Sequence, residues 1–128
     1  MSNAPQTRSA KNLPLYRRMG FALAGVFHAV RTENSFRFHV MAAAGVLATL
    51  LFLRPPAIWW AIMAITVGVV LAAELINTAV ETLADHLHPE QHMQIRLVKD
   101  CAAAAVLIAS IAAVAVAAAF VFDVILRR

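Results

Sequence analysis

Charged residues and cysteine are both scarce in this sequence of 128 residues. Charged residues make up 14 % of the chain and hydrophobic residues 62 %, against about 25 % and 45–50 % in soluble domains. A soluble core of this size could not hide so much apolar surface, so the composition excludes an ordinary soluble domain. The single cysteine, Cys101, excludes an intramolecular disulfide and leaves the redox compartment open. By its length the chain is one domain, and the composition predicts that a bilayer surrounds it.

Apolar residues are also sparse at the start of the sequence, and because no apolar segment precedes Gly20 we expect no cleavable signal peptide. The first twelve residues are small and polar, and we expect residues 1–12 to be a disordered tail in front of a membrane domain at 13–128. The net charge of +4 could indicate binding to nucleic acid. In a membrane chain it indicates topology instead, because Lys and Arg collect on the cytoplasmic side. We therefore expect no nucleic-acid partner.

Long apolar runs stand where the charge is missing, and they predict an all-α integral membrane protein. Residues 13–35 mix apolar and basic side chains at helical spacing, which is typical of an amphipathic helix lying in the membrane interface. Pro55 and Pro56 end the first apolar helix, because proline cannot continue a helix. About 20 residues cross the hydrocarbon core. The three predicted spans are at about residues 36–53, 57–85 and 96–124.

The distribution of Lys and Arg predicts the orientation. Eight of these residues lie before the uncharged part of the first span or between the uncharged parts of the second and third spans, and three lie on the other side. The larger group belongs in the cytoplasm, so we expect a bacterial cytoplasmic (inner) membrane protein whose N terminus and second connector face the cytoplasm. The third span is rich in alanine, with eleven alanines between residues 101 and 119. Small residues let membrane helices pack closely, so self-association is expected.

A polar stripe at the end of the second span is the main candidate site. Glu74, Asn77, Glu81 and Asp85 are spaced so that they share one face of a helix. A helix that simply emerges into water would explain Asp85 well and Glu81 in part. It explains Glu74 poorly, because the seventeen residues at 57–73 carry no charge. Ionisable residues inside a membrane are costly and are candidates for function.

Further charged residues are predicted to face the same side of the membrane. Glu33 comes just before the first span, and Lys99 and Asp100 come just before the uncharged run of the third, which begins at Cys101. Carboxylates and substrate phosphates are the ligands that Mg²⁺ prefers, and a lysine can neutralise a phosphate. A desolvated glutamate can accept a proton from an alcohol. These are the parts of a phosphoryl-transfer site, although the sequence has no glycine-rich phosphate loop and no Walker-type lysine.

The run "AELINTAVETLADHLHPEQHMQIRLVKDCAAAAVLIA" resembles the signature of the small bacterial membrane lipid kinases, the diacylglycerol and undecaprenol kinases. The family pattern E-x-x-N-[ST]-[AG]-x-E-x-x-x-D, followed by K-D before an alanine-rich helix, is similar to this run at eight positions. They are Glu74, Asn77, Thr78, Ala79, Glu81, Asp85, Lys99 and Asp100. The upstream "GFALAGVFHAVRTENSFRFH" is similar to the family's amphipathic region and contains Glu33.

The resemblance implies a homotrimer with active sites that open to the cytoplasm and transfer the γ-phosphoryl group of ATP to a lipid alcohol. It makes Glu74 the general base and makes Glu33 and Glu81 the ligands of a Mg²⁺ ion that bridges the ATP phosphates. The residues expected to bind the nucleotide are Glu33, Asn77, Glu81, Asp85, Lys99 and Asp100.

The lipid alcohol is either undecaprenol or diacylglycerol. In the diacylglycerol branch a serine usually stands three residues after the K-D aspartate, and here that position is Ala103. Together with "TENSFRFH", this favours undecaprenol. A small transporter or channel subunit that uses Glu74 as a proton or cation site is the alternative function. Against it, the polar stripe lies at one end of a helix, whereas carrier sites lie near the midplane.

Overall fold

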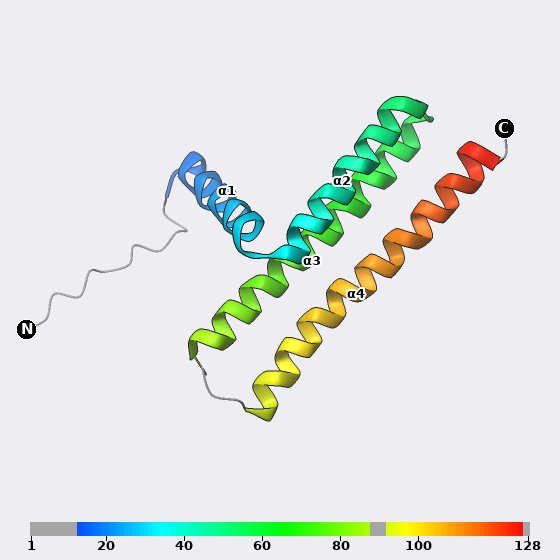
Figure 1. Cartoon of the computed structure of the whole chain (residues 1–128). Coiled ribbons are helices and arrows are strands. Elements are labelled where there is room, and N and C mark those ends of the chain that lie inside the picture. The colour runs from blue at the N-terminus through cyan, green and yellow to red at the C-terminus, as the bar shows by residue number, and fades with distance from the viewer. Residues whose placement is uncertain (1–12, 88–91, 127–128) are drawn as a thin grey trace, which may run out of the picture.

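A computed structural model describes residues 13–87 and 92–126 of the protein and contains only helices in that part of the chain (Figure 1). In chain order they are α1 (Leu15–Thr32), α2 (Asn34–Leu53), α3 (Ala57–Leu87), α4 (Met93–Val121) and a short π-helix, η2 (Phe122–Leu126). The all-α class predicted from the sequence is therefore confirmed. The expected disordered tail at residues 1–12 lies outside the described residues.

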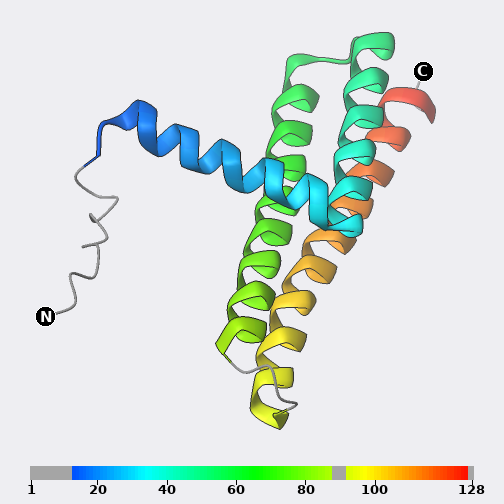
Figure 2. The ribbon, with the colours of Figure 1, turned by 60° about the vertical axis from the view of Figure 1, so that its left-hand side comes forward.

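Three of these helices are long and apolar enough to cross a membrane. They are Asn34–Leu53, with 20 residues, Ala57–Leu87, with 31, and Met93–Val124, with 32. This confirms the predicted number of candidate spans. A helix needs about 20 residues to cross the hydrocarbon core, so α3 and α4 have turns to spare. α3 and α4 run side by side in opposite directions, and α2 lies against the first half of α3 (Figures 1 and 2).

α1 leaves this bundle at a steep angle, and only its last turns lie against the other helices (Figure 2). Ala29 is its one buried residue, while large apolar side chains along the rest of the helix are exposed. A helix at this angle to the membrane-length helices, with apolar and basic side chains, suits the membrane interface. Its interfacial placement stays a prediction.

The apolar core of the chain lies at the end of the bundle away from α1. Leu50, Met63, Phe120 and Val124 are buried together there. Trp59 packs edge-on against Phe120, with ring centroids 5.2 Å apart, and its Nε1 donates to Asp123 Oδ2 at 3.0 Å. Tryptophan is typical of membrane–water interfaces, so this cluster is expected to mark the far surface of the membrane. Only 6 % of the apolar stretch of α4 is buried inside the single chain, although α4 packs along α3. Self-association stays a prediction.

Arg54 ends α2 in the left-handed backbone region, with φ 48° and ψ 54°, and its N–H donates to Leu50 O at 2.9 Å. This conformation costs a residue with a Cβ about 1–2 kcal/mol, whereas glycine adopts it freely. We expect Arg54→Gly to raise the free energy of unfolding by about 1 kcal/mol, measured by thermal unfolding in detergent. Arg54→Ala keeps the Cβ and is the control. An alanine variant as stable as the glycine variant would contradict the explanation.

Candidate active site

Glu74 is the buried ionisable residue of α3, with 3 % of its surface exposed. Two side chains from α2 contact its two carboxylate oxygens. Ser35 Oγ donates to Oε2 at 3.2 Å, and His39 Nε2 lies 3.1 Å from Oε1. Ser35 and His39 are four residues apart and therefore project from the same face of α2. The carboxylate that the sequence marks as the candidate base is thus enclosed between two helices, with a partner on each oxygen.

The corner between α1 and α2 aims these partners at α3. Glu33 is extended, with φ −105° and ψ 117°, and separates the two helices. Its N–H donates the last hydrogen bond of α1 to Ala29 O at 2.9 Å. Its carbonyl accepts the first hydrogen bond of α2 from Arg37 N at 3.2 Å. Ala29 and Phe36 are both buried on either side of it. These buried residues fix the start of α2 against α3, which positions Ser35 and His39.

The next polar pair lies one turn further along α3. Asn77 Nδ2 donates to Glu81 Oε1 at 3.1 Å, and both residues are half-buried. Asn77 Oδ1 is buried and accepts no hydrogen bond from any described residue. A buried acceptor without a donor is costly, so this oxygen is available for a ligand, a water molecule or a cation.

The end of α3 is linked to α4 by an ion pair. Lys99 Nζ lies 2.8 Å from Asp85 Oδ1. Asp100 sits on the outer side of α4, where Arg96 Nε lies 4.0 Å from its Oδ2 and both side chains are largely exposed. The structure therefore brings Asp85 and Lys99 together, while the ion pair given for Asp100 is with Arg96 of its own helix. Glu33 is half-buried at the corner between α1 and α2.

Oxygen donors on α3 fit a Mg²⁺ ion that is bound partly by substrate. Glu81 supplies a carboxylate, and the unpartnered Asn77 Oδ1 lies on the same stripe. In the described part of the chain, no three His, Cys, Asp or Glu residues are close enough to hold a metal ion by themselves. Mg²⁺ usually takes one or two protein carboxylates and completes its shell with water and phosphate oxygens, so the donor set suits an ion that arrives with ATP. Glu33 as a second ligand stays a prediction.

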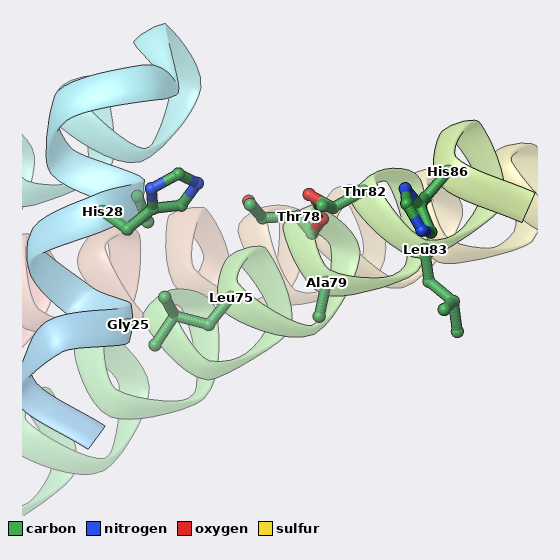
Figure 3. Close-up of a pocket in the computed structure, with 9 residues that line it drawn as sticks. Gly25, His28, Leu75, Thr78, Ala79, Thr82, Leu83 and His86 are labelled. Atoms are coloured by element: carbon green, nitrogen blue, oxygen red, sulfur yellow. Dashed lines mark hydrogen bonds between the residues drawn. The ribbon is translucent and has the colours of Figure 1, made fainter. Parts of the chain in front are cut away.

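An open cavity of about 480 Å³ lies between α1 and α3, beside the polar stripe (Figure 3). The His28 ring of α1 lies across from Thr78, and Thr82 and His86 continue the line along α3. The remaining lining is apolar or small and consists of Gly25, Ala29, Leu75, Ala79 and Leu83. Thr78 is four residues from Glu74, so the cavity supplies open volume one helical turn from the buried carboxylate.

Reasoning from the sequence missed the role of Ser35 and His39 as partners of Glu74. A signal for His39 was present, because an ionisable residue within the expected first span needs a polar partner. The sequence could not say which residue that partner was. Ser35 gave no such signal, because a serine near the start of a helix has many local uses.

This arrangement defines a class of protein, namely a helical membrane protein with a buried carboxylate and a polar stripe near one end of its bundle. Residues 20–121 match the family model for prokaryotic diacylglycerol kinase. The chain therefore belongs to the prokaryotic diacylglycerol kinase family, which is a family of lipid kinases. The matched residues include all of α2, α3 and α4 up to Val121, and every candidate site residue.

Three relatives have sequences similar to this chain. A diacylglycerol kinase of Synechocystis is 40 % identical over 97 residues, which are 75 % of this chain and 55 % of the relative. The undecaprenol kinase of Bacillus subtilis is 35 % identical over 82 residues, which are 64 % of this chain and 67 % of the relative. A diacylglycerol kinase of Haemophilus influenzae is 34 % identical over 89 residues, 70 % of this chain and 75 % of the relative. This chain thus matches only about half of the Synechocystis protein.

Proposed function

We propose that this protein is a Mg²⁺-dependent lipid kinase that transfers the γ-phosphoryl group of ATP to the hydroxyl of a membrane lipid alcohol. The observation that carries the proposal is the burial of Glu74, with a partner on each oxygen, in a chain of this family. A carboxylate in such a place is costly unless it has a use. Accepting the proton of a lipid hydroxyl is a use that fits a lipid kinase.

In the proposed reaction, Glu74 accepts the proton of the lipid hydroxyl as the oxygen attacks the γ-phosphorus of ATP. A new P–O bond forms to the lipid, the bond from the γ-phosphorus to the bridging oxygen breaks, and ADP leaves with that oxygen. Mg²⁺, when bound, neutralises charge on the phosphate oxygens. Glu81 and Glu33 would hold it. Catalysis by such a site depends on positioning and on charge, because the protein forms no covalent intermediate.

The remaining stripe residues are proposed to hold the nucleotide. Asn77 orients Glu81 through the bond already present and can accept a further hydrogen bond at Oδ1. Lys99 is close enough to Asp85 to form an ion pair, so phosphate binding by Lys99 would compete with that pair. Asp85 and Asp100 complete the proposed nucleotide site near the ends of α3 and α4.

We also propose that the domain at 13–128 assembles as a homotrimer in the bacterial cytoplasmic membrane, with its sites facing the cytoplasm. The exposed, alanine-rich α4 supports association, because small residues allow close helix packing in lipid. The excess of Lys and Arg around α1 and the α3–α4 connector supports the orientation.

Undecaprenol is the proposed acceptor, with diacylglycerol as the alternative. Ala103, which stands where the diacylglycerol branch usually has serine, supports undecaprenol. The named relatives include both activities, so the acceptor must be measured. We expect purified protein in vesicles that contain equal amounts of both alcohols to form mainly undecaprenyl phosphate, resolved by chromatography of the lipid products. Phosphatidic acid as the main product would reverse the assignment, and no lipid product from folded protein would contradict the kinase proposal.

A further inference from the structure

Glu74 has two partners, and they come from successive turns of α2. Ser35 contacts Oε2 and His39 contacts Oε1, at 3.2 and 3.1 Å. An ionised carboxylate can only accept hydrogen bonds, so with Glu74 ionised, His39 Nε2 carries the hydrogen of this contact. The two donors together fix both the plane of the carboxyl group and its rotation about the side chain.

The burial of the pair is unequal. The side chain of Glu74 is 4 % exposed and that of His39 is 18 % exposed. His39 also lines an apolar cavity of about 110 Å³ that extends between α2, α3 and α4, among residues such as Val46 and Val70. The imidazole thus stands between the carboxylate and the apolar interior of the bundle. Without it, one oxygen of Glu74 would face that interior with no donor, which is costly.

Arginine does not fill this role in the structure. Arg37 is the arginine of α2 and lies between Ser35 and His39 in the sequence. Its Nη2 instead donates to Asn34 Oδ1, in an exposed contact within α2. Among the described residues, the polar contacts recorded for Glu74 are those of Ser35 and His39. The orientation of the carboxylate therefore depends on these two donors.

We propose that His39 is a positioning residue that holds the Glu74 carboxyl group at the angle needed to accept the proton of the lipid hydroxyl. The inference rests on the proposed kinase function and on the geometry of the pair. His39 acts through the Glu74 oxygen that it contacts. Ser35 restrains the other oxygen. Without His39, the hydrogen bond from Ser35 would be the one remaining restraint, and the carboxyl group could rotate around it.

A pair of amide substitutions tests the role of the Nε2 donor. The amide of His39→Gln can place an N–H near the position of Nε2, whereas His39→Asn is one methylene shorter and cannot reach it. We expect His39→Asn to lower kcat by about 100-fold, because misplacement of a catalytic group by about 1 Å has this effect. His39→Gln should keep activity within about tenfold of the wild type. The KM for ATP should change little in either variant, because His39 is not among the residues proposed to bind ATP.

A double variant separates positioning from a general structural role. In the Glu74→Gln background, His39→Asn should lower the residual rate no further, since residues that act through one another are not additive. The proposal would be overturned if His39→Asn lowered the rate of Glu74→Gln by the same factor as it lowers the wild-type rate. Equal rates for the single variants His39→Gln and His39→Asn would also overturn it. If the His39→Asn variant does not fold, the His39→Gln variant decides alone. A loss of kcat of more than about 100-fold in folded His39→Gln protein would overturn the proposal. If the wild type itself phosphorylates no lipid, the proposed function fails instead.

Discussion

Replacement of Glu74 by glutamine is expected to lower kcat for lipid phosphorylation by about 10²–10⁴-fold, the usual contribution of a general base. Glutamine has nearly the same shape, and its side-chain oxygen can still accept a hydrogen bond from Ser35 or His39. The substitution therefore removes the proton acceptor with little change in packing. The KM for ATP should stay close to that of the wild type, because Glu74 is not among the proposed nucleotide ligands. Initial rates at saturating lipid and ATP measure the effect.

Asp123→Asn is the matched control for this variant. Asp123 accepts a hydrogen bond from Trp59 Nε1 at the opposite end of the bundle, at 3.0 Å. The amide oxygen of asparagine can still accept that bond, and the change also removes one carboxylate from a membrane-length segment. We expect the control to keep the wild-type kcat. A Glu74→Gln variant with a kcat as high as that of the control would exclude Glu74 as the base.

Removal of Mg²⁺ by a chelator is expected to abolish phosphoryl transfer, and readdition of Mg²⁺ is expected to restore it. Without the ion, the site has too little positive charge to offset the ATP phosphates, because the described stripe on α3 is acidic or neutral and Lys99 is paired with Asp85. Full activity in the chelator would contradict the proposed metal dependence.

Variants of α3 then locate the ion. Glu81→Gln removes a proposed ligand and should raise the Mg²⁺ concentration that gives half-maximal rate. Asn77 donates to Glu81 Oε1 at 3.1 Å and so orients this proposed ligand. Asn77→Ala should therefore raise the Mg²⁺ concentration for half-maximal rate by about 10- to 100-fold, the usual effect of losing a group that orients a metal ligand. Thr82→Ala is the control on the same helix, since the Thr82 hydroxyl donates to the Thr78 carbonyl. Equal Mg²⁺ requirements in all three variants would place the ion elsewhere.

The all-α class and the three membrane-length helices could be predicted from the sequence because their causes are local. Charge is absent from 57–73, and Pro55 and Pro56 interrupt the apolar run. The burial of Glu74 was also expected, since a carboxylate beside so many apolar residues needs a partner. The helix bounds differ at their ends. α4 begins at Met93, three residues before the expected start, because the side chain of His92 accepts a bond from Gln94 N and caps the helix.

The partners inside the site could not be predicted, because they depend on how the helices pack. The sequence gives the face of α3 that carries Glu74 but not the residue of α2 that meets it. Ser35 and His39 meet Glu74 only because Glu33 breaks the helix and Phe36 is buried at the corner. The contact between Lys99 and Asp85 likewise needs the antiparallel register of α3 and α4. The roles predicted for Glu33, Asn77, Glu81, Asp85, Lys99 and Asp100 stay predictions.

Transfer of label from γ-phosphate-labelled ATP to lipid tests the central claim most directly. Purified wild-type protein would be reconstituted with Mg²⁺ and with undecaprenol or diacylglycerol, beside Glu74→Gln and protein-free vesicles. The account predicts labelled lipid phosphate from the wild type and at most about one hundredth of that rate from Glu74→Gln. Folded wild-type protein that labels neither alcohol would contradict the account and favour the alternative in which Glu74 serves proton or cation transport.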